Sequence, residues 1–235
     1  MGDTNSGSVD RSNGQPSMQS PAARTEKQNA TADEALPKLY LIIYGVAKKH
    51  NIGQILRSAT AFNVTAVCLV GSRKFNSFGA HGSEVYVPML HFEDLDACCK
   101  ALKEDHGVID ILGIEIDDSA LPVHRHPFRG HTALMMGEEG HGMNEKQLRL
   151  CDGLVYISQY GAGTASLNVC VATSIVLHNF AVWAGFHERE RKEQKYVVGE
   201  RPLRNAPRGM VPYTEKELAA IRAMRAEKKM RTASE

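Results

Sequence analysis

The sequence of 235 residues has little of what a membrane protein or a disulfide-stabilised protein needs. No window holds the roughly 20 consecutive apolar residues of a membrane span. The nearest candidate, residues 169–185, is interrupted by Thr173, Ser174, His178 and Asn179. The five cysteines form no C-x-x-C pair, which predicts neither a disulfide framework nor a zinc knuckle. We therefore expect a soluble protein that works in reducing surroundings.

The first 38 residues contain no aromatic side chain and are rich in Ser, Asn, Gly, Ala and Gln. Such a segment buries too little apolar surface to offset its chain entropy, so residues 1–38 are predicted to be disordered. They lack the apolar run of a secretory signal, and their scattered acidic residues fit a transit peptide badly. The expected location is the cytoplasm or the nucleus, and a mitochondrial location stays open.

The charge is nearly balanced overall but is distributed unevenly. The net charge is +1, from 28 basic and 27 acidic residues. Residues 187–235 hold 13 Lys and Arg against 8 Asp and Glu, which gives +5 and leaves −4 for the rest of the chain. Such a tail is usually a solvated helix and linker, but a cationic segment beside a mildly acidic domain can also hold a polyanion.

Short apolar runs rich in β-branched residues alternate with helical patterns from residue 39 onward. The predicted strands are 39–45, 65–70, 109–116, 132–137 and 153–158, and the predicted helices are 52–62, 92–103, 144–150, 165–184 and 214–230. Strands that alternate with helices predict an α/β fold with a mostly parallel sheet and helices on both faces. In such sheets ligands bind beyond the carboxyl ends of the strands, and three polar clusters fall at these junctions.

The first cluster lies in residues 48–62, KKHNIGQILRSATAF. Asn51 could simply cap the helix, while Arg57 stands away from the apolar stripe and could simply be solvated. Alternatively both side chains face one ligand, with the planar donors of Arg57 directed at phosphate or ribose oxygens.

The second cluster is MMGEEGHGMN, residues 135–144. Its three glycines allow unusual backbone angles and close approach, and Glu138, Glu139 and His141 add reactive groups. Glu139 and His141 lack partners at metal-ligand spacing, so no metal is predicted.

The third cluster is the stretch from Tyr156 to Asn168, in which a glycine-rich loop leads to Ser166 and Asn168 at the start of an apolar segment. It contains no phosphate-binding loop of the G-x-x-x-x-G-K type. GAGTAS, residues 161–166, resembles a dinucleotide fingerprint only loosely, because no acidic residue follows about 20 positions later, so a dehydrogenase is disfavoured.

Taken together, these clusters resemble a known family. NIGQILR (51–57), MGEEGHG (136–142) and SLNVCVA (166–172) are similar in order and spacing to the three motifs of the SpoU class of RNA 2′-O-methyltransferases, in the SPOUT superfamily. The resemblance covers residues 39–183. It departs from the family where Ile157-Ser158-Gln159 replaces the usual Ile-Pro-Met and where the interval from Gly161 to Ser166 is one residue longer.

The resemblance implies a C-terminal deep trefoil knot and a homodimer whose active sites draw on both subunits. It implies S-adenosylmethionine as cofactor and RNA as partner, and it divides the chain into a disordered segment 1–38, a methyltransferase domain 39–185 and a basic extension 186–235 with a terminal helix. The implied catalytic residues are Arg57, Asn51, Glu139, Ser166 and Asn168. The implied cofactor-binding residues are Ile114, Gly137, Gly142, Ile157, Ser166 and Leu167.

The expected activity is therefore methylation of a ribose 2′-hydroxyl in RNA. The lack of a separate N-terminal RNA-binding domain favours tRNA slightly over rRNA. The main alternative is a catalytically silent RNA-binding or ribosome-assembly factor with the same fold, and the presence of Asn51, Arg57, Glu139 and Asn168 argues against it.

Overall fold

The computed structural model describes residues 36–45, 49–137, 141–203 and 206–232. Outside these ranges lie most of the segment 1–38, residue Glu139 and part of the terminal extension. What the sequence indicates about them stays a prediction. None of the described helices is long and apolar enough to cross a membrane.

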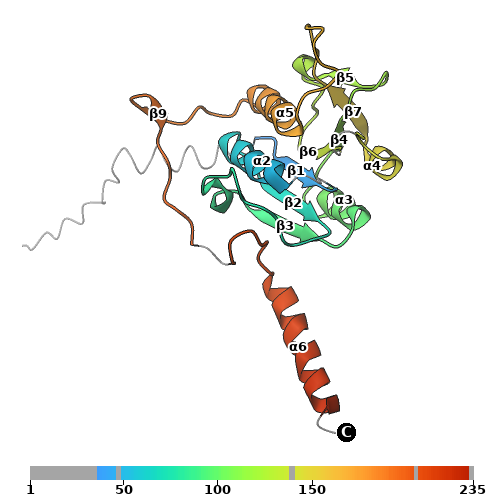
Figure 1. Cartoon of the computed structure of the whole chain (residues 1–235), viewed down its shortest axis with the longest axis vertical. Helices are drawn as coiled ribbons and strands as arrows, with labels where there is room; N and C mark the ends of the chain where they lie inside the picture. The colour runs from blue at the N-terminus through green and yellow to red at the C-terminus, as the bar shows by residue number, and fades with distance from the viewer. Residues whose placement is uncertain (1–35, 46–48, 138–140, 204–205, 233–235) are drawn as a thin grey trace, which may run out of the picture. The chain divides into compact units, whose positions relative to one another are not determined.

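The elements alternate along the chain as the sequence predicts (Figure 1). In order they are β1 (Leu39–Ile43), α2 (Lys49–Ala61), β2 (Ala66–Val70), η1 (Ser83–Val85), β3 (Met89–Phe92), α3 (Leu95–Glu104), β4 (Asp110–Ile114), β5 (Leu121–Pro122), η2 (Val123–Arg125), β6 (Thr132–Met136), α4 (Glu145–Leu150), β7 (Gly153–Tyr156), α5 (Val169–Trp183), β8 (Arg191–Lys192), β9 (Lys195–Tyr196) and α6 (Glu215–Thr232). Strands β3, β5, β8 and β9 were not predicted, and α5 begins four residues later than expected.

Seven strands form one sheet in the order β3-β2-β1-β6-β4-β7-β5, and every pair in it is parallel. The predicted parallel α/β fold is thus confirmed. Strand β6 pairs with β1 on one side and with β4 on the other, although β4 precedes it in the chain. The predicted deep knot stays a prediction, because the chain path after β6 includes residues outside the described ranges.

Both faces of the sheet are buried, which is why its strands read as continuous apolar runs. Leu39, Leu41 and Ile43 of β1 face the core shared with α2 and α5, whereas Tyr40 and Ile42 face the core shared with α3. Helices α2 and α5 lie side by side on one face, and α3 and α4 cover the other (Figure 1). This packing brings the starts of α2 and α5 to the carboxyl edge of the sheet.

Side chains cap the helices that begin at this edge. Asn144 and Gln147 form a reciprocal capping box at α4, and the amide of the fully buried Gln147 donates to the Met136 carbonyl at 2.8 Å. Asn168 caps α5 by accepting from the Cys170 backbone N–H at 2.9 Å. The predicted capping pair of Thr214 with Glu217 is present at α6.

Candidate active site

The carboxyl ends of β4, β6 and β7 open into a cavity of about 430 Å³, which we call the cofactor cavity. This volume lies within the range of small-molecule sites. Three segments far apart in the sequence line it, one after each of these strands. The lining residues are Ile114, Glu115, Ile116, Met136, Gly137, Gly142, Tyr156, Ile157, Gln159, Ser166, Leu167, Asn168, Val169, Ala172 and Thr173.

All six residues that the sequence assigns to the cofactor line this one cavity: Ile114, Gly137, Gly142, Ile157, Ser166 and Leu167. Of the residues assigned to catalysis, Ser166 and Asn168 line it as well. The structure therefore brings together the second and third sequence motifs. Their individual roles stay predictions.

The two glycines of the second motif are required by close backbone approach. A Cβ on Gly137 would lie 2.5 Å from the backbone carbon of Gly142. Gly142 itself has φ of +69°, and a Cβ there would lie 2.5 Å from Oε2 of Glu115. Any side chain at either position would enter the cavity wall or distort the turn.

Glu115 is a lining residue that the sequence analysis missed. Its Oε2 accepts from the Met143 backbone N–H at 2.7 Å, and its Oε1 accepts from its neighbour Ile116 at 2.9 Å. The carboxylate thus ties the turn after β6 to the end of β4. It falls inside the predicted strand 109–116 and outside all three motifs, so no signal in the sequence marked it as a lining residue. Thr173, which donates to the sulfur of Met136 at 2.7 Å, was missed for lack of any such signal.

Ser166 and Asn168 stand at the junction between the glycine-rich loop and α5. Ser166 is exposed, and its carbonyl accepts from the Thr164 hydroxyl at 2.8 Å. Asn168 lines the cavity and also caps α5, and its predicted catalytic role stays a prediction.

The first motif is placed differently from the expectation. Asn51 is not an N-cap but lies inside the first turn of α2, where it is only 6% exposed. Its side-chain oxygen accepts from the Cys170 thiol at 3.2 Å, which joins α2 to α5. Helix α2 begins at Lys49, two residues before Asn51, so the interpretation of Asn51 as an N-cap was wrong.

Arg57 is exposed and does not line the cofactor cavity. It follows Gly53 by one helical turn and precedes Thr60 by three residues, on the flank of α2 that packs against residues 78–83. The structure therefore does not unite Arg57 with Ser166 and Asn168 within one chain. Glu139 lies outside the described residues.

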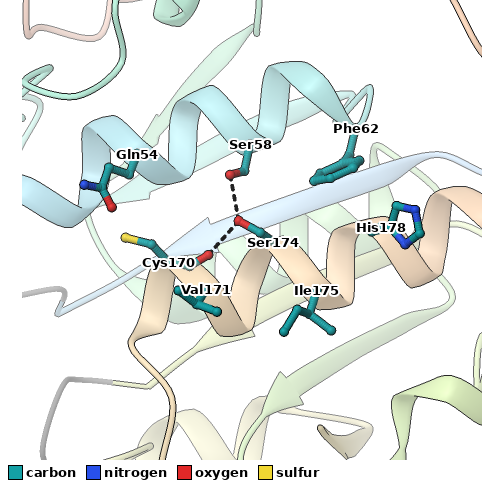
Figure 2. A pocket seen from close by; sticks show the side chains of 8 residues that line it. All are labelled: Gln54, Ser58, Phe62, Cys170, Val171, Ser174, Ile175 and His178. Atoms are coloured by element: carbon teal, nitrogen blue, oxygen red, sulfur yellow. Dashed lines mark hydrogen bonds between the residues drawn. The ribbon is translucent and has the colours of Figure 1, made fainter.

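Helices α2 and α5 form a groove of about 460 Å³ on their outer side (Figure 2). The hydroxyls of Ser58 and Ser174 are hydrogen-bonded across it at 2.7 Å. The ring of Phe62 packs edge-on against His178, with centroids 5.6 Å apart. Val171 is 48% exposed, so an apolar side chain of the third motif remains partly uncovered here.

The basic extension is partly folded onto the domain. Residues 208–217, which we call the C-terminal strap, run beside residues 73–77 and form an antiparallel bridge between Lys74 and Met210. Val211 is fully buried in the main core. The cations expected to reach RNA were Arg189, Arg191, Lys192, Lys195, Arg201, Arg204 and Arg208.

Three of these cations have partners within the chain. Arg189 donates to the Val197 carbonyl, Arg191 lies 3.4 Å from a Glu188 carboxylate oxygen, and Arg208 donates to the Ser77 hydroxyl at 3.0 Å. The interleaved acidic residues thus offset part of the local positive charge.

The arrangement is a parallel α/β sheet with a small-molecule cavity at its carboxyl edge, lined by residues of the second and third motifs. The described residues contain no cluster of His, Cys, Asp and Glu side chains that could hold a metal.

Comparison with known proteins adds relatives and structures. RlmB of Escherichia coli K12, named as a 23S rRNA (guanosine-2′-O-)-methyltransferase, is 35% identical over 142 residues, 58% of this chain and 57% of the relative. The RlmB of Acinetobacter baylyi is 30% identical over 146 residues, 60% of this chain and 58% of the relative. The match thus spans less than two thirds of the length of these relatives.

Solved structures show the same fold. The AdoMet-bound rRNA methyltransferase of Sinorhizobium meliloti matches with a TM-score of 0.56 at 21% identity, over 63% of this chain and 57% of that one. The tRNA-modifying TrmH/SpoU enzyme of A. aeolicus matches with a TM-score of 0.53 at 22% identity, over 67% of this chain and 82% of that one.

The model of the SpoU rRNA Methylase family matches residues 38–178, the region that contains all three motifs and the cofactor cavity. The chain belongs to the SpoU rRNA Methylase family.

Proposed function

We propose that the protein transfers a methyl group from S-adenosylmethionine to a ribose 2′-hydroxyl of RNA. The observation that carries the proposal is the cofactor cavity, in which all six expected cofactor residues meet from three separate segments. The relatives named for guanosine methylation of 23S rRNA favour rRNA as the substrate. These relatives do not support the slight preference for tRNA over rRNA that was predicted from the sequence. Because they are bacterial proteins, they do not support a nuclear location either.

The cavity fits the proposed cofactor in chemistry as well as in size. S-adenosylmethionine supplies an electrophilic methyl group on a sulfonium centre. Ile114 and Leu167 offer an apolar slot for a purine ring, while the bare backbone at Gly137 and Gly142 lets polar main-chain atoms approach a ligand. Ser166 offers a hydroxyl at the mouth of the cavity.

The residues proposed for the ribose side act by position and charge. Alignment of nucleophile and methyl group can contribute up to ~7–11 kcal/mol in ideal cases. A guanidinium hardly ever loses its proton in a protein, so the role of a base does not suit Arg57. We assign it to the phosphate next to the reacting ribose and to the negative charge that develops on the 2′-oxygen. Asn51, Glu139, Ser166 and Asn168 are assigned to hydrogen bonds that fix the ribose, Arg57 and the backbone.

The position of Arg57 supports an active site shared by two subunits. Arg57 does not line the cofactor cavity of its own chain, and we assign it to the site of a second copy. The groove between α2 and α5, with its exposed Val171, lies on the two helices that carry the first and third motifs. A homodimer that closes this groove would place the first motif of one subunit near the third motif of the other.

The activity is tested by mapping ribose methylation in total RNA from cells with and without the protein. We expect one 2′-O-methylated nucleotide, in the large-subunit rRNA, to disappear with the protein and to return in a purified reaction with S-adenosylmethionine. RNA binding without any methylated product would instead identify the catalytically silent alternative.

The shared site is tested by mixing two inactive variants, Arg57→Ala and Asn168→Ala. In a two-fold dimer with sites built across subunits, half of the mixed dimers' sites are intact, so random mixing should restore about a quarter of the activity. No recovery, although mixed dimers are shown to form, would place Arg57 and Asn168 in the same chain's site or outside it.

A further inference from the structure

A second cavity, of about 870 Å³, lies at the carboxyl ends of β1 and β2, and we call it the strap cavity. Strand β1 pairs with β6, which lines the cofactor cavity, so the two cavities are neighbours along the same edge of the sheet. The strap cavity is lined by Ile43, Gly45, Ile52, Leu69, Val70, Ser72, Lys74, Phe75, Asn76, Ser77, Arg208 and Gly209. None of these residues is used by the proposed methyl transfer.

The outer wall of the strap cavity is held in place from both sides. The Phe75 backbone donates to the Gly209 carbonyl at 2.9 Å, and Val211 donates to the Arg73 carbonyl at 3.0 Å. Gly209 has φ of +72°, and a Cβ there would lie 2.5 Å from the Phe75 carbonyl oxygen. On the opposite side, the backbone of Phe78 presses against α2. Backbone hydrogen bonds and close backbone contacts therefore hold this wall in place.

Arg73 anchors the strap further along. Its guanidinium pairs with Glu217, donates to the Pro212 carbonyl at 3.2 Å and lies 4.2 Å from the centre of the Tyr213 ring. These contacts leave Arg73 only 12% exposed, so it serves the strap and is not available to a ligand.

The cavity pairs an apolar floor with a cationic rim. Ile43, Leu69 and Phe75 supply the apolar surface. Lys74 and Arg208 are its charged lining residues, and among the described residues that line it none is acidic. Glu84, whose carboxylate lies 3.8 Å from Arg208, offsets part of that arginine's charge from behind. Lys74 is exposed and takes part in none of the ion pairs among the described residues. An apolar floor beneath a cation fits a nucleobase joined to a phosphate.

We propose that the strap cavity binds an unpaired nucleotide of the RNA substrate that flanks the methylated one, with Lys74 contacting its phosphate. The identity of the ligand as RNA rests on the proposed function. The cavity, its fixed wall and its charge are observations that do not depend on that function. The strap thus contributes to RNA binding by shaping a site, and not through a flexible cationic chain.

The first test compares Lys74→Ala with Lys100→Ala, which removes an exposed lysine from α3 on the other face of the sheet. Binding of a fluorescent large-subunit rRNA fragment is measured by anisotropy across a salt series. Loss of one phosphate contact should weaken binding about fivefold at 0.1 M salt and lower the salt slope by about 0.7 to 0.9. Lys100→Ala should change neither. Equal effects of the two variants, or no effect of Lys74→Ala, would overturn the proposal.

The second test locates the ligand by amide chemical shifts in the full chain. A short single-stranded oligoribonucleotide should shift the amides of residues 72–77 and Gly209. The same shifts with guanosine monophosphate alone, at equal affinity, would identify a free nucleotide and contradict RNA as the ligand. Shifts confined to the cofactor cavity would contradict the site itself.

Failure of this proposal is distinguishable from failure of the proposed function. Calorimetry with S-adenosylmethionine and the methylation assay on the wild-type protein report only on the cofactor cavity and the reaction. Lys74→Ala should retain full cofactor affinity, since Lys74 does not line that cavity.

Discussion

Gly53 of α2 lies against the carbonyl of Phe78, so closely that a Cβ on Gly53 would fall 1.9 Å from that oxygen. The contact joins the helix of the first motif to the loop that walls the strap cavity. A side chain cannot be accommodated by rotation of a neighbour, because the obstructing atom belongs to the backbone.

We therefore predict that Gly53→Ala destabilises the protein by about 1–3 kcal/mol or more, because the loop or the helix must shift. Thermal and urea unfolding measure this. Gly199→Ala is the control, since nothing lies within 4 Å of a Cβ built there. Similar stabilities of the two variants would show that the Phe78 contact does not set the effect.

Gly142→Ala should impair cofactor binding. The variant combines strain at a φ of +69° with a clash against the Glu115 carboxylate, in a wall of the cofactor cavity. A cost of about 1.4 kcal/mol or more corresponds to at least a tenfold weaker affinity for S-adenosylmethionine by calorimetry. Gly161→Ala, which meets open space, should bind the cofactor as the wild type does. Unchanged affinity in Gly142→Ala would remove the second motif from the cofactor site.

Arg57→Ala should lower methyl transfer by about a hundredfold or more while cofactor affinity stays unchanged. The reason is that Arg57 is assigned to the RNA side and does not line the cofactor cavity. Arg57→Lys should also be poor, because a point charge does not reproduce the planar fork of donors. Arg149→Ala on α4 serves as the exposed-arginine control. Loss of cofactor binding in a folded Arg57→Ala protein would show that the assignment is wrong.

Truncation should separate the strap from the terminal helix. A chain that ends at Tyr213 loses α6 and the Arg73–Glu217 pair, and a pair of this kind contributes at most about 1 kcal/mol. A chain that ends at Gly199 also loses the fully buried Val211, whose burial contributes about 1.5–3 kcal/mol. We expect the shorter chain to melt at a clearly lower temperature. Equal melting temperatures would show that the strap does not stabilise the domain.

The cysteines should react slowly in the folded protein. Burial raises the pKa of Cys99 and that of Cys151 to about 12, and the hydrogen bond with Cys68, together with burial, raises the pKa of Cys98. At pH 8 the thiolate fraction of Cys99 and Cys151 is then about one in ten thousand, and it grows as the pH rises. Mass spectrometry after iodoacetamide treatment should find these thiols unmodified until urea is added. Rapid native labelling of Cys99 or Cys151 would contradict the burial.

Local patterns were sufficient to predict much of the sheet and of the cofactor cavity. Five predicted strands are confirmed as β1, β2, β4, β6 and β7. They are apolar runs buried on both faces of the sheet, and such runs can be recognised in a sequence without knowing which strands pair with them. The glycines of the second motif and the polar pair Ser166 and Asn168 stand at strand ends, where ligands of parallel sheets bind. The motifs themselves, once compared with a family, predicted which residues share the cavity.

Other features depended on contacts that no local pattern reports. Strand β3 was missed because His91 interrupts its apolar run, and its imidazole instead meets the Gly71 carbonyl. The strap was missed because its apolar stretch, Met210 and Val211, is only two residues long and lies between Gly209 and Pro212, and only the docked structure shows Val211 in the core.

The sequence by itself determined the segments that form β1, β2, β4, β6 and β7, because an apolar run is a local property, and the family resemblance of its motifs implied which residues line the cofactor cavity. Only the tertiary structure decided that β6 lies between β1 and β4, that Asn51 is buried against Cys170, and that Arg57 does not line the cofactor cavity of its own chain. The physical reason is that a hydrophobic pattern specifies that a face is buried. The partner that buries it is chosen by pairing between distant segments, which the whole chain must satisfy at once.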